Sequence, residues 1–254
     1  MDPIVRDARR RLVETLRDAF ERDERVRALW EAGSAAFDRE DEWSDVDLYA
    51  LVRDGELSDV LDLAEEALRT LGPIDLRWEP AGGAFARTAQ RFLRVATFRP
   101  TLFVDLLTVE SGGLAPLLER ELHGEPRVLF DRDGVVVAAS CDAEAVARNA
   151  ERMRRDLDAA WPLFLVLVEK ELGRGNLLGA LGFWHGAVLP RLHRRLRLER
   201  CPARATFGAH YARVDLGDEL ADELEALALV ASADDLRARI ARADALHRRA
   251  SGAA

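Results

Sequence analysis

Residues 33–52 decide the fold, and they read GSAAFDREDEWSDVDLYALV. The stretch opens with Gly33-Ser34 directly after a short apolar run, 26–30. It closes with residues 45–52, in which polar and apolar side chains alternate. Alternation with a period of two predicts a strand that carries Asp45 and Asp47 on one face and its apolar side chains on the other. The stretch therefore predicts a glycine turn followed by a strand with two neighbouring acids.

Around this centre the sequence predicts an α/β unit. Apolar residues at three- and four-residue spacing predict helices, and short β-rich runs bounded by turn residues predict strands. The strands on either side of Arg99-Pro100 are expected to form a hairpin, and Gly82-Gly83 is expected in a loop. The expected helices are 3–22, 57–71 and 114–122, and the expected strands are 26–30, 45–52, 74–78, 91–98, 101–109 and 127–130.

After about residue 141 no further strand is predicted. Helical periodicity covers 143–172, 176–198, 218–231 and 234–250. Pro162 is expected to kink or restart the first of these helices, and the 251–254 tail is expected to fray. The sequence therefore predicts an α+β fold, with a mixed-sheet domain over 1–140 and a helical, substrate-binding bundle over 141–254. The active site is expected in the cleft between the two domains.

Composition and charge narrow the classes of protein. Of the 254 residues 48 % are hydrophobic, enough for a sizeable core. The formal charge is −9; residues 1–140 hold 29 acids and 19 bases, which leaves +1 for 141–254. An acidic first half disfavours a nucleic-acid partner and is compatible with a cationic small substrate.

The chain has no run of about 18 apolar residues, so no membrane span is expected. Its first residues are charged and lack a secretory signal, which predicts a cytoplasmic protein. Cys141 and Cys201 lie far from each other and from any His at ligand spacing. They therefore predict no disulfide and no zinc site.

The glycine turn and the paired acids together point to phosphate chemistry. A glycine after a strand lets the backbone approach a phosphate, and the Ser34 hydroxyl and nearby amides can donate to phosphate oxygens. Asp45 and Asp47, two residues apart on a strand, point the same way and can converge on Mg²⁺. Such cations bridge a triphosphate and stabilise the charge that develops at the α-phosphorus during displacement.

A third acid is expected from a neighbouring strand. Asp105 fits because it lies within TLFVDLLTV at 101–109, an otherwise apolar strand where an unpaired charge is costly to bury. Two alternatives remain open: Asp105 at a strand end paired with Arg94 across the hairpin, or Glu79 or Glu110 as the third acid.

Gly33-Ser34 with Asp45-Val46-Asp47, inside WSDVDLY at 43–49, resembles the signature of the nucleotidyltransferase (DNA polymerase β-like) superfamily. Within it the chain looks most like antibiotic nucleotidyltransferases of the lincosamide and aminoglycoside branches. The resemblance is specific over about 24–52 and looser over 90–110. It implies an ATP-binding, adenylyltransferase-like enzyme that uses two Mg²⁺ ions. Such an enzyme moves a nucleoside monophosphate from a nucleoside triphosphate to a hydroxyl of a small molecule, such as an antibiotic, and releases pyrophosphate.

The resemblance carries over residue by residue. Gly33 and Ser34 match the phosphate-binding turn, and Asp45 and Asp47 match the metal ligands. Asp105 matches the third acid, which in such enzymes binds a metal or acts as the general base. Many relatives carry an Arg and a second Gly shortly after the serine, whereas this chain has AAFD at 35–38, so one phosphate contact is missing.

The helical half offers two further candidates for the nucleotide site. Arg174 matches a basic residue that reaches the triphosphate, and Lys170 is a neighbouring candidate. The alternative interpretation is a helix C-terminus, whose dipole favours cations. Trp184-His185 and His210-Tyr211 either line an acceptor pocket or belong to the core, and the basic run 191–200 is interpreted as a solvated face.

Two other functions stay open from the sequence alone. One is a nucleotide-binding or regulatory protein without catalysis. The other is an enzyme that nucleotidylates a macromolecule, which the acidic first half disfavours. The acidic loop 38–42 either attracts a polycation or is simply solvated. A homodimer is compatible with all of these readings.

Overall fold

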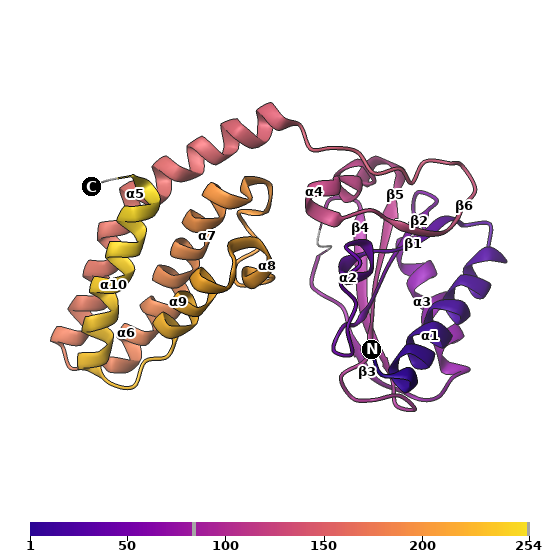
Figure 1. The fold of residues 1–254 in the computed structure, drawn as a ribbon. Helices are drawn as coiled ribbons and strands as arrows, with labels where there is room; N and C mark the ends of the chain where they lie inside the picture. The colour runs from indigo at the N-terminus through magenta and orange to yellow at the C-terminus, as the bar shows by residue number, and fades with distance from the viewer. Residues whose placement is uncertain (83–84, 253–254) are drawn as a thin grey trace. The chain divides into compact units, whose positions relative to one another are not determined.

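The computed structural model describes residues 1–82 and 85–252. The chain divides into two compact units, Met1–Ser140 and Cys141–Ala254, each with its own hydrophobic core (Figure 1). The second glycine of the expected 82–83 loop and the last two residues of the expected frayed tail lie outside the described residues.

The first unit is built on a six-stranded sheet in the order β3-β4-β5-β2-β1-β6, as far as the described residues show. The central strands β2 and β5 pair in parallel, and the other neighbours pair antiparallel. The hairpin expected across Arg99-Pro100 is present as β4 and β5. The strands are β1 (Val26–Glu31), β2 (Val46–Val52), β3 (Ile74–Trp78), β4 (Thr88–Val95), β5 (Val104–Glu110) and β6 (Arg127–Asp131).

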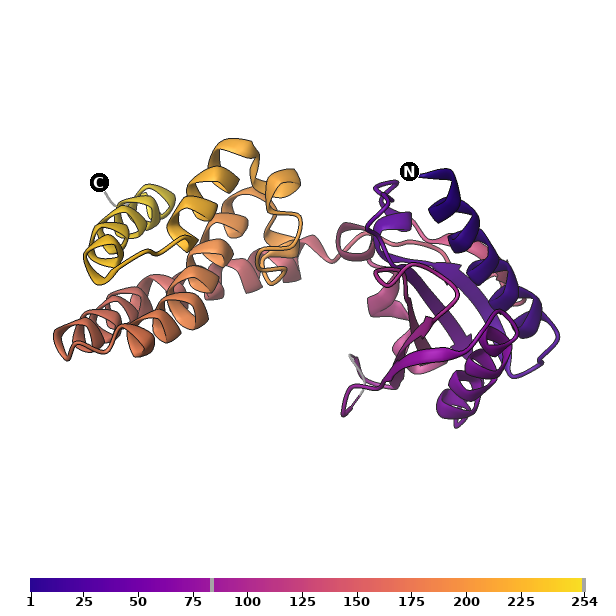
Figure 2. The same ribbon diagram turned by 90° about the horizontal axis from the view of Figure 1, so that it is seen from below.

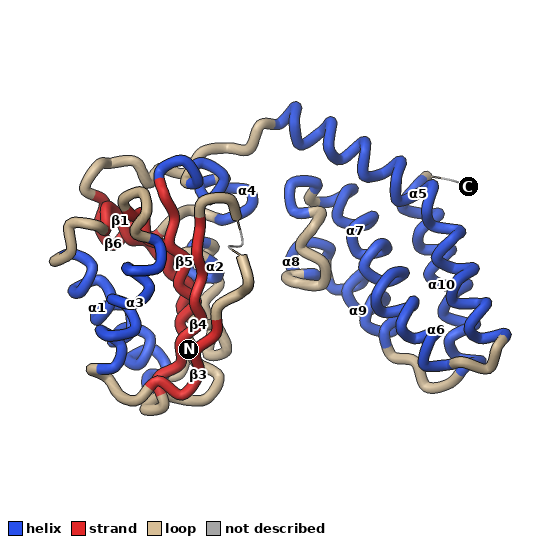
Figure 3. Tube along the Cα trace, turned by 180° about the vertical axis from the view of Figure 1, so that it is seen from behind, coloured by secondary structure: helices blue, strands red, loops and turns tan. Residues whose placement is uncertain are grey.

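Two helices cover one face of this sheet, α1 (Pro3–Glu21) and α3 (Leu57–Arg69), as Figures 1 and 3 show from opposite sides. α1 begins where the Asp2 carboxylate accepts a hydrogen bond from the Ile4 amide at 2.8 Å and Pro3 occupies the first turn. Its buried row includes Leu12, Leu16 and Phe20, which join the apolar side chains of β2 and β5 in one core. The opposite face of β2 and β5 carries Asp47 and Asp105 at one end and apolar side chains such as Leu107 further along the strands.

The segment between β5 and β6 differs from the expected helix over 114–122. It forms two 3₁₀ turns, η1 (Ser111–Gly113) and η2 (Ala115–Leu118), and then the short α4 (Arg120–His123). A continuous helix fails here because Glu119 has extended backbone angles and forms a β-bridge with Ala139. Leu117 packs with Trp30 and Leu107 on the sheet face opposite α1 and α3.

The described residues of the second unit form helices joined by turns and loops, with no strand among them, as Figure 2 also shows. Of the two outcomes expected at Pro162, a kink or a restart, the restart is absent: α5 runs through the proline, which lies on the exposed side of the helix. The expected helix 176–198 is divided by a π-helical turn, η3. The elements are α5 (Ala143–Gly173), α6 (Leu177–Phe183), η3 (Trp184–Val188), α7 (Leu189–Arg200), η4 (Pro202–Arg204), α8 (Ala212–Leu216), α9 (Asp218–Ala228) and α10 (Ala233–Ser251).

The predicted fold class is confirmed: a mixed-sheet α+β first unit is followed by a helical region. Among the described helices none combines the length and apolarity needed to cross a membrane.

Candidate functional site

The central parallel strands bring two acids together. In the β2–β5 register Asp47 is the direct partner of Asp105, and both side chains are half-buried. Their strand neighbours, such as Val46 and Val104, are fully buried under α1 and α3, so the two acids share the opposite face. Hydrogen-bonded strands lie about 4.8 Å apart, which sets the two aspartates side by side. Asp45 precedes β2 by one residue and acts electrostatically on both acids.

The glycine turn is fitted around Asp47. Gly33 begins the short helix α2 (Gly33–Ala36) with φ +54°, a left-handed conformation that favours glycine. A Cβ atom on Gly33 would lie 1.9 Å from Oδ2 of Asp47, so no other residue leaves room for that carboxylate. The Ala32 amide donates to the Asp47 carbonyl oxygen at 3.0 Å, and the Ser34 amide donates to the Asp47 carboxylate. The turn and the acid are therefore one structural unit.

Ser34 carries an unused polar group. Its hydroxyl is buried and has no hydrogen-bond partner within the described residues. A buried hydroxyl without a partner costs free energy, so one is rarely found in a folded protein unless a water or a ligand supplies the partner. A phosphate oxygen at this turn would supply it.

The electrostatics of the acids favour a bound cation. Burial, with the charges of Asp45 and Asp105, raises the pKa of Asp47 to about 8. Burial and the charge of Asp45 raise the pKa of Asp105 to about 6, against the lowering effect of a hydrogen bond from Gln90. Burial also raises the pKa of Asp45. None of the three carboxylates forms an ion pair within residues 1–82 and 85–252.

The three acids fit Mg²⁺ by their donor chemistry, since carboxylate oxygens are the ligands this ion prefers. They lie at neighbouring positions on one face, but the described residues hold no group of three acidic, His or Cys side chains already closed around a single ion position. The site therefore offers the ligands and their placement, and a cation would have to draw the carboxylates together.

Sequence reasoning missed two residues that hold the acids. The Gln90 amide nitrogen, on β4, donates to Oδ1 of Asp105 at 2.6 Å. Arg9, on α1, is 5 % exposed and donates to the Ser44 carbonyl at 2.8 Å and to the Asp45 carbonyl. A signal for Arg9 exists, because it occupies the apolar row of α1 between Val5 and Leu12, where a charge requires a partner. An isolated Gln in a strand gives no such signal.

The alternatives for the third acid are paired elsewhere. Arg94 forms its ion pair with Asp75 at 2.9 Å and not with Asp105. Glu79 pairs with Arg77 at 2.9 Å and also with Arg91. Glu110 pairs with Arg87 at 2.9 Å and accepts from the Gly55 amide. Asp105 is thus the acid that the strand register sets beside Asp47.

The basic candidates of the helical half lie at the end of α5. Lys170 is exposed, and Arg174 forms an ion pair with Glu171. Trp184 belongs to the core, since it is fully buried and its ring nitrogen donates to the Leu227 carbonyl at 3.1 Å. The interpretation of 191–200 as a solvated face is wrong in part, because Arg195 and Arg197 are buried in ion pairs.

The acidic loop 38–42 is partly neutralised. Glu40 pairs with Arg9 at 2.9 Å and with Arg127 at 2.8 Å. Trp43, just after the loop, is exposed and lies under the guanidinium of Arg99. The loop is therefore tied to its own unit and is not simply a free cluster of negative charge.

Comparison with known proteins gives structural likenesses only. No family model matches the chain, and no curated protein matches it. Among solved structures it is similar to an aminoglycoside 6-adenyltransferase from Bacillus subtilis, with 16 % identity and a TM-score of 0.38 over 96 % of this chain and 89 % of that one. It is also similar to a nucleotidyltransferase-like protein from Exiguobacterium sibiricum 255-15, with 16 % identity and a TM-score of 0.41 over 95 % and 76 %.

Both proteins carry names from the superfamily that the motif resembles. Both TM-scores lie below 0.5, so the function has to be inferred from the geometry of this chain.

Proposed function

We propose that this protein is a magnesium-dependent nucleotidyltransferase. It binds a nucleoside triphosphate at the first unit and transfers the nucleoside monophosphate to a hydroxyl group of a small molecule, with release of pyrophosphate. One observation carries the proposal: Asp47 and Asp105 are register partners on the parallel strands, beside a glycine turn shaped around Asp47.

Each residue of the site has a role in the proposed reaction. The Ser34 hydroxyl and the backbone of the Gly33 turn bind phosphate oxygens. Asp45, Asp47 and Asp105 would hold Mg²⁺, which when bound supplies positive charge against the developing charge of the phosphates. Asp105 also accepts the proton of the acceptor hydroxyl as the general base. Gln90 holds one oxygen of that carboxylate and leaves the other for this task.

We further propose that ATP is the donor and that the acceptor is a cationic small molecule, such as an aminoglycoside antibiotic. The support is the acidic character of residues 1–140 and the likeness of the Gly-Ser and Asp-Val-Asp motif to antibiotic nucleotidyltransferases. Lys170 and Arg174 remain candidates for contact with the triphosphate.

The test is release of pyrophosphate with each nucleoside triphosphate in turn, against a panel of cationic and neutral hydroxyl acceptors. Asp45→Asn and Asp47→Asn should each lower the rate by at least about 10³-fold, the scale of a lost electrostatic clamp. Asp105→Asn should lower it by about 10²–10⁴-fold and still bind the triphosphate. Asp75→Asn, an exposed acid on β3 paired with Arg94, is the matched control and should keep full activity.

The same assay separates the enzyme from a binding protein. Triphosphate binding that depends on Mg²⁺, without turnover on any acceptor, would establish a nucleotide-binding protein instead. Wild-type rates in Asp45→Asn or Asp47→Asn would show that the metal assignment is wrong.

A further inference from the structure

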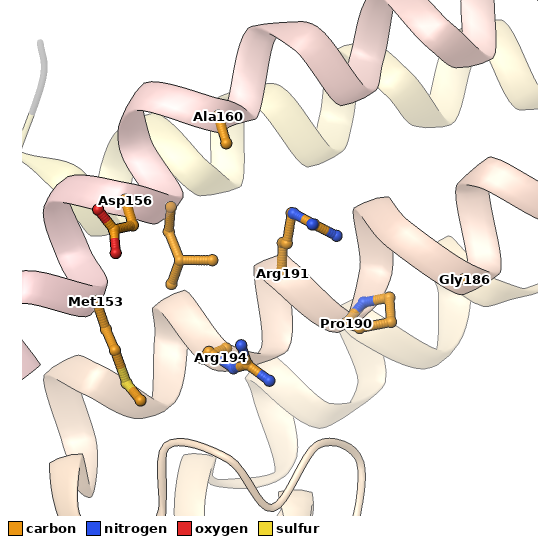
Figure 4. Close-up of a pocket in the computed structure, with 8 residues that line it drawn as sticks. Met153, Asp156, Ala160, Gly186, Pro190, Arg191 and Arg194 are labelled. Carbon is orange, nitrogen blue, oxygen red and sulfur yellow. The ribbon is translucent and has the colours of Figure 1, made fainter.

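The second unit contains a hollow of about 470 Å³ between α5 and the segment η3–α7 (Figure 4). One wall comes from α5, with Met153, Asp156 and Ala160. The other comes from η3 and α7, with Gly186, Arg191 and Arg194. Its volume lies within the range of about 300–1,000 Å³ that is usual for small-molecule sites.

The hollow borders the smaller of two apolar clusters in this unit. Met153 packs with one small apolar cluster around Leu157 and Leu198, whereas Trp161 belongs to the larger cluster of the bundle. Ala160 and Gly186 also line the hollow and have too little side chain to fill it. Gly186 is part of the π-helical turn η3, and π turns are frequent at functional sites.

Two arginines at the hollow have no acid partner. Arg191 and Arg194 are half-buried, and neither forms an ion pair within the part of the chain that the structure describes. They are three residues apart on α7 and so lie on the same side of the helix. The same helix satisfies its other buried arginines: Arg195 pairs with Asp158 at 2.9 Å, and Arg197 pairs with Asp215.

Arg191 is held in place without an anion. Its guanidinium lies 3.5 Å from the ring centroid of Phe164, and it donates to the Ala187 carbonyl at 3.0 Å. Burial and the charge of Arg194 lower the pKa of Arg191, so the two like charges oppose each other. Asp156, on the facing wall, forms no ion pair in the described residues either, and Figure 4 shows it across the hollow from Arg191.

We propose that this hollow is a binding site for a small molecule with a phosphate or carboxylate group, which Arg191 and Arg194 hold. The planar guanidinium binds such oxyanions through two parallel hydrogen bonds, and an oxyanion between the two arginines replaces their mutual repulsion by attraction. The apolar wall at Met153 accepts the uncharged part of the ligand. The site is independent of the function proposed for the first unit.

The experiment titrates the full chain in EDTA, without nucleotide, with inorganic phosphate and separately with succinate, up to about 50 mM, and measures heat of binding. At least one of the two should bind. Arg194→Gln should weaken it by about 10- to 100-fold, the scale of a lost hydrogen bond to a charged group. Arg191→Lys keeps the positive charge but loses the two parallel hydrogen bonds of the guanidinium, so it should also weaken binding of the anion. Asp156→Asn should tighten it, because it removes a negative charge from the facing wall.

One control keeps the result specific. Arg148→Gln changes an exposed α5 arginine that pairs with Glu144 outside the hollow, and it should leave the affinity unchanged. Phosphate binding stronger than succinate binding identifies a phosphorylated ligand, and the reverse identifies a carboxylate. Binding of neither anion, equal binding by Arg194→Gln, or an equal loss of affinity in Arg148→Gln would overturn the proposal.

Discussion

A carboxylate oxygen of Asp47 lies where any residue other than glycine would place its Cβ atom at position 33. The glycine is needed there twice, once for its positive φ of +54° and once for the missing Cβ. The positions of the Asp47 carboxylate and of the Gly33 turn are therefore coupled, because the carboxylate occupies the space that a Cβ atom on residue 33 would take.

This coupling predicts that Gly33→Ala removes activity. The left-handed conformation costs an alanine about 1–2 kcal/mol, and the carboxylate of Asp47 has to move away. A misplacement of about 1 Å at a reacting centre can cost about 100-fold in rate. The rate of pyrophosphate release should fall by that much or more. Gly55→Ala, at φ +89° with no atom within 4 Å of its added Cβ, carries only the backbone cost and should keep its activity.

The acids also predict an unusual dependence of stability on pH. The pKa of Asp47 is raised in the folded state, so the folded protein holds this proton more tightly than the unfolded chain does. The stabilising contribution is therefore complete below about pH 4, the value for an unfolded aspartate, and is lost as the pH rises towards about 8. Without divalent metal, the free energy of unfolding should fall between these pH values.

Asp47→Asn should remove this loss and make the metal-free protein more stable than wild type at pH 8. Urea denaturation in EDTA at pH 5 and pH 8 measures both proteins. Asp75→Asn is the matched control of opposite sign, because the hydrogen bond from Arg94 lowers the pKa of Asp75. If Asp47→Asn were less stable than wild type at pH 8, burial of this charge would not be the dominant effect.

At the level of elements, one buried arginine ties α3 to the sheet. Arg91, on β4, is 2 % exposed and pairs with Glu65 of α3 at 3.1 Å and with Asp62 at 2.8 Å. Glu65 is itself 6 % exposed and also pairs with Arg69 and with Arg77 at 2.8 Å, so removal of Arg91 leaves a buried carboxylate that keeps two arginine partners. Removing one partner of a buried pair costs about 3–5 kcal/mol when the remaining charge is uncompensated, and less when other partners remain.

Arg91→Met should therefore lower the free energy of unfolding by about 1–3 kcal/mol, measured by urea denaturation. Arg94→Met, three residues along the same strand, breaks a more exposed pair with Asp75 and should cost less than about 1 kcal/mol. Equal costs for the two variants would show that Arg91 contributes no more than a surface pair.

The sequence predicted those elements whose signal is periodic and local. The apolar row of α1 and the alternation in β2 place both elements within one or two residues, because each pattern has a single face to bury. The prediction of a helix over 114–122 was wrong, because Glu119 adopts an extended backbone and forms a β-bridge with Ala139. That contact is tertiary, and no local sequence pattern indicates it. The π-helical turn η3 was not predicted either, because its residues keep the periodicity of an α-helix.

In the candidate site, too, the residues that could be predicted are those with a local signal. Gly33 and the Asp-Val-Asp pair could be identified because they are close in sequence. Asp105 was visible as a charge in an apolar strand, but its register against Asp47 comes from the tertiary pairing of β2 with β5. Gln90 could not be identified, because a polar residue on a half-exposed strand is ordinary until its partner is known.

On the scale of the whole molecule, the charge distribution makes a prediction about the acceptor. If the acidic first half attracts a cationic acceptor, the attraction should weaken with salt, because the Debye length falls from about 10 Å at 0.1 M to about 3 Å at 1 M. The apparent affinity for a cationic acceptor should drop clearly across that range. A neutral hydroxyl acceptor is the control. Affinity for the cationic acceptor that stays constant with salt would point to an uncharged natural acceptor.

The parallel pair of β2 and β5 forms the centre of the sheet, with hydrogen-bonded strands on both sides. Backbone amides in such strands exchange with solvent deuterium only when the domain opens almost completely, whereas turns exchange through small local openings. We therefore expect the backbone amides of Asp47 and Asp105 to exchange among the slowest of their unit, and those of the Gly33-Ser34 turn to exchange faster. Any backbone movement at the proposed site is then expected in the turn and not in the two central strands.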